Sequence, residues 1–460
     1  MSWLVASYML KIELSGHVKL LMSRPIKILA ILPALIPSSI ILVIEPLLYL
    51  AGLGKVEFRV RLEHLYVRAS DLEWADLVVF CRNTEPAYND ILQRVVSLKK
   101  PYLYELDDNF FELPLDLPEG RYHRVPERID QLVNYITNAD LVRVYSLPLQ
   151  TRVKQYALNA RFVKAPVNLF SIPGVPPHSG PGKLKIVFST SRTIADELSQ
   201  IFVKDMIRVI NEFGNKIEVH FWGFVPEELK HFPSVKFHRF MPNYQKYMRK
   251  MYGQGYDIGL APMKNDVFHN SKTNNKFREY GACWIAGIYS NSEVYSNCVE
   301  DGITGLLVSN DEGEWYQAIV RMMKDVGMRK AIQMQARAVV EKEYSLDIFS
   351  EILLNDINSV LGEFVPRETI RVDNVQKAEN VKFENEHKPK SLFLRLFDLI
   401  RFVFGKMRRS LNNYGLLLSF RLFLDEIGRY AQYFWLSYRI KRVNLYYLIT
   451  HFSDGFRRNK

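Results

Sequence analysis

The sequence predicts an α/β protein with two parallel-sheet domains. Strand-like and helix-like segments alternate along most of the 460 residues, and a Pro/Gly-rich stretch divides them into two series. A composition of 48% hydrophobic and 24% charged residues supplies enough apolar material for two cores. The expected parts are an N-terminal extension (1–23), a first domain (24–170), a linker (171–183), a second domain (184–345) and a return helix (346–362).

The first domain alternates short apolar runs with segments of helical spacing. Each run is bounded by turn residues or by the next helical segment, as expected for the buried strands of a parallel sheet. The predicted strands are Ile26–Leu32, Asp76–Cys81, Pro101–Leu106 and Asp140–Tyr145, and the predicted helices are Pro86–Leu98 and Arg124–Asn138.

One stretch, Ile28–Ile44, has 17 residues without a charge and could be read as a membrane span. A span normally needs about 20 apolar residues, and this stretch contains Pro33, Pro37 and a Ser-Ser pair. We favour a buried strand at Ile26–Leu32, then a loop and a helix, with the membrane span as the alternative.

The second domain repeats the alternation after the linker Ser171–Lys183, which is dense in Pro and Gly. Asp311 to Glu314 resemble a capping box that starts the helix at Trp315. The predicted strands are Leu184–Phe188, Ile217–Phe221, Val235–Phe240, Asp257–Ala261 and Gly305–Val308, with a long helix at Ile194–Phe213. Ligands of such sheets bind at the carboxyl ends of the strands, so we expect a site in the cleft between the domains.

The net charge of +11 is concentrated at the C-terminus. Residues 391–460 contain 13 Lys and Arg against 4 Asp and Glu, which gives +9. Within them Arg395, Asp398 and Arg401 form a narrow charged stripe on an otherwise apolar helix, the pattern of a helix lying on an anionic membrane surface. Packing against the body or a dimer partner is the alternative, and the high apolar content argues against nucleic acid. Residues 363–390 are highly charged and predict a flexible linker.

The three cysteines predict neither a disulfide framework nor a zinc site. Cys81, Cys283 and Cys298 are odd in number, far apart and without a nearby histidine pair. Residues 1–10 lack the cationic start of a secretory signal. We therefore expect a cytoplasmic protein, with the inner face of the membrane as the place where its tail would bind.

The segment HNSKTNNKFREYGACWIAGIYS, residues 269–290, predicts a nucleotide-diphosphate site on a helix that feeds a buried strand. Lys272, Lys276 and Glu279 are spaced by four and three residues, so they lie close together on a helix. A helix N-terminus and lysines suit phosphate, and a glutamate can accept hydrogen bonds from ribose hydroxyls. We expect Gly281 and Ala282 to let the helix approach the sheet closely. A solvated Lys276–Glu279 pair is the alternative.

Two segments, KFREYGACWIAGIYS and VEDGITGLLVSNDEGEW, together resemble the donor-binding half of GT-B glycosyltransferases of the family-four type. The matching residues are Glu279-Tyr280, Gly281-Ala282, Asp301-Gly302 and Thr304-Gly305. The resemblance implies two Rossmann-like domains that face a cleft. It also implies transfer of a sugar, of the hexosyl type, from a nucleotide-diphosphate sugar to a hydroxyl acceptor, without a metal or cofactor. Enzymes of this family usually retain the anomeric configuration.

The resemblance also implies site residues. Asp107 and Asp108, in PYLYELDDNFFELP, match the polar pair that faces the transferred sugar; a helix or turn cap is the alternative. Being adjacent, they are not a metal-binding pattern. Arg192, in FSTSRT, matches a phosphate-binding cation, with a surface arginine as the alternative. Ser271 stands where the family often has a second glutamate, and Thr273 lies beside the phosphates.

The expected function is therefore sugar transfer in surface polysaccharide or glycolipid synthesis. The expected partners are a nucleotide-sugar donor, a glycan or lipid-linked acceptor and, through residues 391–460, a membrane surface. A nucleotide-sugar isomerase and a non-catalytic glycan-binding or scaffold protein are the alternatives, and Ser271 is the main hint toward the latter.

Overall fold

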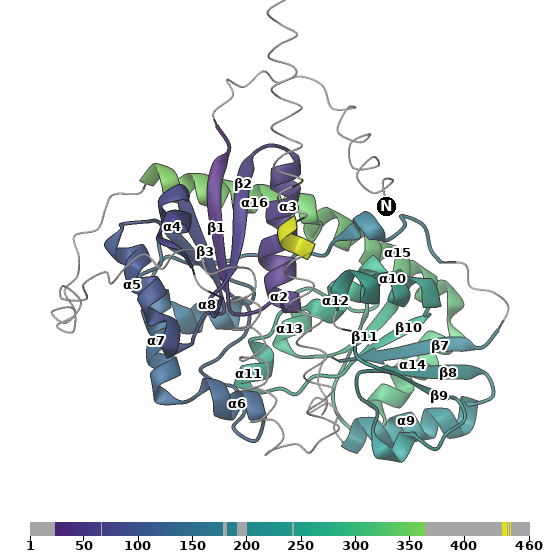
Figure 1. The fold of residues 1–460 in the computed structure, drawn as a ribbon. Helices are drawn as coiled ribbons and strands as arrows, with labels where there is room; N and C mark the ends of the chain where they lie inside the picture. Colours follow the sequence, from purple (N-terminus) through teal and green to yellow (C-terminus); the bar gives the residue numbers. More distant parts are fainter. Residues whose placement is uncertain are drawn as a thin grey trace, which may run out of the picture.

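The part of the chain that the structure describes contains two six-stranded sheets, one in each domain, and every strand there pairs with its neighbours in parallel (Figure 1). The sheet orders are β2-β1-β3-β4-β5-β6 and β12-β11-β10-β7-β8-β9. The fold class that the sequence predicts is confirmed. The computed structural model describes residues 24–65, 67–177, 182–190, 200–241, 243–363, 435–438, 440 and 442.

The first sheet contains the four predicted strands and two that were not predicted. Its strands are β1 (Ile26–Leu32), β2 (Val56–Leu62), β3 (Leu77–Cys81), β4 (Tyr102–Leu106), β5 (Leu141–Val144) and β6 (Ala160–Phe162). The two additional strands, β2 and β6, lie at the edges. In β2, charged and apolar residues alternate, so only one face is buried and no continuous apolar run marks the strand. The three residues of β6 are too few to show a pattern.

The helices of the first domain cover both faces of its sheet (Figure 1). They are α2 (Pro37–Ser39), α3 (Glu45–Gly52), α4 (Ala69–Trp74), α5 (Asn89–Ser97), α6 (Pro118–His123), α7 (Pro126–Thr137) and α8 (Leu147–Val153), with a π-helical turn at Ile40–Ile44 and 3-10 turns at Pro86–Tyr88 and Leu169–Ser171. The uncharged stretch is thus a buried strand followed by a loop and a helix, as favoured. Among the described residues no helix combines the length and apolarity that crossing a membrane requires.

The second sheet has the strand order of a dinucleotide-binding Rossmann domain: counted within the domain, the strands run 6-5-4-1-2-3. The strands are β7 (Leu184–Ser189), β8 (Ile217–Trp222), β9 (Val235–His238), β10 (Ile258–Ala261), β11 (Ala286–Ser290) and β12 (Leu306–Val308). The helices are α9 (Gln200–Phe213), α10 (Tyr244–Gln254), α11 (Val267–Asn270), α12 (Asn275–Ala282), α13 (Glu293–Ser296), α14 (Glu314–Lys324) and α15 (Val326–Glu343), with a 3-10 turn at Glu227–Leu229.

The capping box predicted before α14 is wrong, although the helix begins where expected. The residue before the helix is Gly313, with a φ of 86° and no side-chain cap of its own. Asp205 of α9 instead accepts hydrogen bonds from the backbone N–H groups of Gly313 and Tyr316, both at 3.2 Å. A carboxylate from another helix therefore satisfies the free N–H groups that a local cap would have satisfied.

The last long helix, α16 (Leu346–Glu363), returns to the first domain and packs on α3 (Figure 1). Its Asp356 is buried and pairs with Arg143 of β5 at 3.0 Å and with Arg161 of β6. Arg143 also pairs with Glu105 of β4 at 2.7 Å. Because removing one partner of a buried ion pair is costly, this cluster fixes the return helix to the first sheet.

Most of the predicted tail, including Ser391–Phe404, lies outside the described residues, as do the N-terminal extension and most of the predicted linker at 363–390. The described residues of the tail are 435–438, 440 and 442, which are helical. Leu436 and Ile440 among them are buried in the large core cluster that also contains Ile41 and Leu47. Trp435 and Tyr438 are 50% and 60% exposed.

Candidate active site

A cleft of about 600 Å³ separates the two domains, and the carboxyl ends of strands from both sheets line it. This is where ligands of open parallel sheets bind. The structure brings six of the predicted residues together in this cleft. Asp107 and Asp108 lie on the first-domain wall, and Lys272, Thr273, Lys276 and Glu279 lie on the second-domain wall.

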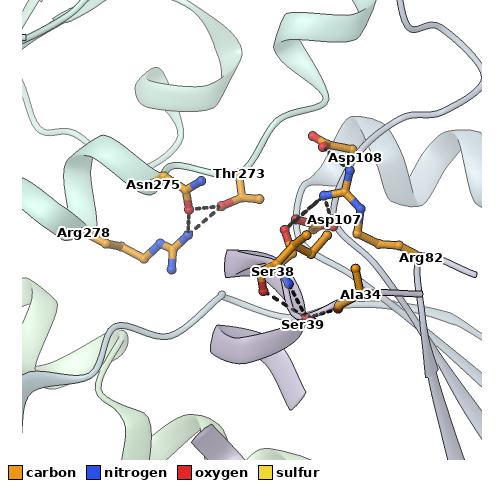
Figure 2. Close-up of polar contacts among 10 residues, drawn as sticks. Ala34, Ser38, Ser39, Arg82, Asp107, Asp108, Thr273, Asn275 and Arg278 are labelled. Carbon is orange, nitrogen blue, oxygen red and sulfur yellow. Dashed lines mark hydrogen bonds and ion pairs between the residues drawn. The ribbon is translucent and has the colours of Figure 1, made fainter. Parts of the chain in front are cut away.

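The first-domain wall is centred on Arg82, which sequence reasoning missed. Arg82 follows β3, and its guanidinium reaches between the two predicted aspartates after β4 (Figure 2). Its Nη1 donates to Asp107 at 3.1 Å and its Nη2 pairs with Asp108 at 2.9 Å. Ser38, in α2 after β1, donates to Asp107 at 2.5 Å and accepts from Arg82 at 3.0 Å. Three strand ends therefore build one hydrogen-bonded cluster.

The backbone of Arg82 is held in the left-handed region, with a φ of 62°. Residues other than glycine rarely adopt it, and such strain is found preferentially at functional sites. A charged residue directly after the buried run DLVVFC at a strand end was the signal that could have identified Arg82.

The charges of this cluster depend on one another. Burial raises the pKa of Asp107, the guanidinium of Arg82 opposes that rise, and the neighbouring Asp108 adds to it, so the net pKa is raised. Burial alone would lower the pKa of Arg82, but the two carboxylates outweigh it and raise that pKa. Arg82 therefore stays charged and neutralises only part of the aspartate pair.

A stack of rings backs the same wall. The guanidinium of Arg82 lies 4.8 Å from the centre of the Phe110 ring, and His123 stacks on Phe110 at 4.3 Å with an interplanar angle of 2°. Burial lowers the pKa of His123 to about 4, and the positive charges of Arg82 and Arg128 act in the same direction. His123, which lines the cleft, is therefore a neutral imidazole at neutral pH.

The charged part of the second-domain wall comes from residues 267–282, which form two short helices instead of the single predicted helix. Lys272 lies in the turn between α11 and α12, not on a helix. Arg278 holds this turn: it is buried, donates to Thr273 at 2.7 Å and to Asn274 at 3.2 Å, and contacts Asn275 (Figure 2). As a result, α12 begins close to Thr273, and no side chain caps its N-terminus.

Glu279 is buried and held by two donors. Its Oε2 accepts from Lys276 at 2.7 Å and from the hydroxyl of Tyr247 at 3.2 Å, and Tyr247 is in turn 2.9 Å from Ser189. The side chains of Lys276 and Glu279 are only 22% and 7% exposed, which contradicts the alternative of a solvated pair. Sequence reasoning missed Tyr247 and Ser189, since they come from α10 and β7, distant in the chain.

Gly281 has a different role from the one expected. A Cβ added there would lie 2.7 Å from Val340 and 2.9 Å from the carbonyl oxygen of Ala336, both on α15. Gly281 thus permits the close packing of α12 on the next long helix rather than on the sheet.

Ser271 does not line the cleft. It is buried between the domains: its hydroxyl donates to the carbonyl of Val267 at 2.7 Å and accepts from Asn109 of the first domain at 3.1 Å. Its own carbonyl accepts from Ser146 of the first domain at 2.6 Å. The serine therefore joins the two domains at this point. Arg192 lies outside the described residues.

Two Rossmann-like domains that face each other across a cleft define the GT-B fold. Among solved structures, a glycosyltransferase of Rickettsia africae ESF-5 shares this fold with a TM-score of 0.54 and 14% identity, over 74% of this chain and all of that one. Sucrose-phosphate synthase of Thermosynechococcus elongatus gives 0.55 and 12%, over 73% and 99%. HepE of Anabaena, solved with UDP and glucose, gives 0.52 and 13%, over 73% and 100%. No protein-family model and no curated protein sequence matches the chain.

Proposed function

We propose that the protein is a glycosyltransferase that moves a sugar from a nucleotide-diphosphate sugar to a hydroxyl acceptor. One observation carries the proposal: Lys272 before α12, together with Lys276 and the buried Glu279 within it, faces the Arg82-centred aspartate pair across one cleft. The first group suits a nucleotide diphosphate, and the second suits the hydroxyl groups of a sugar. HepE, which has the same fold, was solved with UDP and glucose and supports this assignment.

The donor would lie along the second-domain wall. The uncapped start of α12 offers backbone N–H groups to a diphosphate, and Lys272, Thr273 and Lys276 lie beside it. The carboxylate of Glu279, fixed by Tyr247 and Lys276, would accept hydrogen bonds from the ribose hydroxyls. Arg192 remains a predicted phosphate ligand. For Ser271 we propose domain joining instead of donor binding.

In the proposed reaction, the bond between the sugar C1 and the diphosphate oxygen breaks as the bond from C1 to the acceptor oxygen forms. The acceptor proton leaves with the diphosphate or to water. Lys272 and Lys276 would stabilise the charge that develops on the leaving group, which is the largest catalytic contribution expected here. Asp107 or Asp108 would orient the transferred sugar or the acceptor. Retention of configuration, independence of metal and cofactor, and a hexosyl substrate are parts of the proposal that rest on the family resemblance.

The acceptor and the location are proposed from the tail. Residues 391–460 carry most of the net charge, Trp435 and Tyr438 are exposed, and Arg442 lies over the Tyr438 ring. Aromatic and basic side chains together favour a membrane surface. We propose a cytoplasmic enzyme that binds the inner face of the membrane and uses a glycan or lipid-linked acceptor in surface polysaccharide or glycolipid synthesis.

Calorimetry with UDP, GDP, dTDP, ADP, CMP and their sugars tests the donor site. We expect one nucleotide to bind and Glu279→Ala to weaken it about tenfold or more, since a hydrogen bond to a charged group is lost. Glu227→Ala, a glutamate outside the cleft, is the control and should bind as the wild type does. If no nucleotide binds the folded protein at millimolar concentration, the proposal fails. If a nucleotide does bind, the reaction product distinguishes the two enzyme classes: a transferase yields a glycosylated acceptor, and an isomerase yields an epimerised nucleotide sugar.

A further inference from the structure

The two walls of the cleft carry opposite charge. Among the described residues, the first-domain wall has one cation and three carboxylates, and the second-domain wall has three cations and one carboxylate. The first set is Arg82, Asp107, Asp108 and Glu119, and the second is Lys272, Lys276, Arg278 and Glu279. An anion is therefore attracted to the second-domain wall and repelled by the first. The donor's diphosphate fits the second wall, so this asymmetry bears on the acceptor.

The cation of the first-domain wall is not available to a ligand. Arg82 is committed to Asp107 at 3.1 Å and to Asp108 at 2.9 Å, and one face of its guanidinium lies against Phe110. Its side chain is only 17% exposed, whereas that of Asp108 is 28% exposed. An acceptor at this wall thus meets carboxylate oxygens rather than the guanidinium.

His123 supplies no second cation. Burial lowers its pKa to about 4, and its ring is stacked flat on Phe110 at 4.3 Å. At neutral pH it offers a neutral ring nitrogen that can take part in a hydrogen bond to a hydroxyl. The wall therefore holds acceptors of hydrogen bonds and a neutral imidazole, and no free positive charge among its described residues.

Apart from Ser38, the remaining lining residues of this wall are apolar. Leu113, Leu117 and Phe110 line the cleft next to the carboxylates. A sugar ring presents hydroxyl groups that donate hydrogen bonds and C–H groups that prefer apolar contact, so it matches a surface of this mixed kind. A carboxylate or phosphate on the same ring would lose its water and gain no cation, which is costly.

We propose that the acceptor ring seated on the first-domain wall is an uncharged sugar, and that Asp108 and Glu119 accept hydrogen bonds from its hydroxyls and exclude anionic rings. The inference rests on the proposed function and narrows its acceptor. A lipid-linked acceptor would then keep its phosphate groups outside this wall and present a neutral terminal sugar to the donor.

Matched ligand pairs test the inference on the full chain at pH 7. The pairs are the methyl glycosides of glucose, galactose and mannose and the corresponding methyl uronides, which differ only in a CH₂OH group or a carboxylate. Binding is measured by saturation-transfer NMR titration, with and without the nucleotide found by calorimetry. We expect at least one neutral glycoside to bind about tenfold or more tightly than its uronide. Equal or tighter binding of the uronide, or no glycoside binding while the nucleotide binds, overturns the inference.

Two charge-reversal variants test whether the first-domain wall causes the preference for the neutral glycoside. Glu119→Lys places a cation on the cleft wall, and Glu127→Lys makes the same change outside the cleft, at the start of α7. Glu119→Lys should reduce the preference for the neutral glycoside about tenfold, and Glu127→Lys should leave it unchanged. An unchanged preference in Glu119→Lys, or equal shifts in both variants, overturns the role of this wall. If the preference is found but no nucleotide binds, the proposed function fails and the inference about the wall stands.

Discussion

The two walls of the cleft are built in different ways. Arg82, Asp107 and Ser38 meet on the first-domain wall from the segments that follow three strands, and each is hydrogen-bonded to the other two. The charged residues of the second-domain wall all come from one continuous segment, residues 272–279, braced from within by Arg278. A wall that is assembled from distant segments should be sensitive to the loss of one member, whereas a continuous segment should keep its shape.

Replacing Arg82 gives the largest expected effect, because it removes the centre of the assembled wall. Arg82→Met leaves the buried Asp107 and the half-buried Asp108 without their cation, which should lower the free energy of unfolding by about 3–5 kcal/mol at pH 7. Urea denaturation measures the change. Part of the loss should be recovered near pH 4, where the aspartates take up protons.

The control for this prediction is Arg94→Met, which removes an exposed ion pair with Asp90 in α5. Exposed pairs contribute about 0–1 kcal/mol, so this variant should unfold almost as the wild type does. Equal destabilisation by the two changes would show that Arg82 is no more than a surface cation. Nucleotide binding by Arg82→Met should remain, because the second-domain wall does not depend on it.

This difference also explains what the sequence could predict. The alternation of apolar runs predicts ten of the twelve strands in the described residues, and one contiguous segment of the sequence predicts that Lys276 and Glu279 line a site. The partners of these residues are determined by tertiary structure: Tyr247 reaches Glu279 from α10, and Asp205 caps α14 from α9. No local pattern marks such contacts, because the residues become neighbours only when the chain folds.

Ser271 is a second case in which the local sequence does not predict a tertiary contact. Its position in the chain, eight residues before Glu279, predicts a donor contact by resemblance, but the structure turns its hydroxyl toward Asn109 of the other domain. The break between α11 and α12, which Arg278 stabilises through Thr273, changes the direction in which residue 271 points. Spacing along a predicted helix does not apply across such a break.

The pH dependence of the free energy of unfolding should show the effect of burying His123 in the first-domain wall. The pKa of His123 is lowered from an ordinary 6.5 to about 4 by burial, so the unfolded chain binds the proton more tightly than the folded one. The contribution of neutral His123 to the free energy of unfolding is fully present above pH 6.5 and is lost as the pH falls toward 4. The loss amounts to at most about 3 kcal/mol.

His123→Phe keeps the ring that stacks on Phe110 and removes the titration. The free energy of unfolding, measured by urea denaturation at several pH values from 7 to 4, should therefore fall less steeply in this variant than in the wild type. His231→Phe removes one histidine from the exposed surface and serves as the matched control. If His123→Phe follows the wild-type curve between pH 6.5 and 4, the histidine is not held neutral in the folded protein.

The smallest expected effect concerns the contact between the two domains at Ser271. Ser271→Ala removes the hydroxyl that accepts from Asn109 and leaves that amide nitrogen buried without its partner, while the backbone contact with Ser146 remains. An unsatisfied buried donor costs about 1–3 kcal/mol. In the Ser271→Ala background the shared hydrogen bond is already gone. Adding Asn109→Ala should therefore lower the free energy of unfolding only by the loss of the packing of the Asn109 side chain. A double-mutant cycle in urea measures this coupling. Full additivity of the two single changes would show that the hydrogen bond contributes nothing to joining the domains, and the domains would then be held together by α16 and the packing around it.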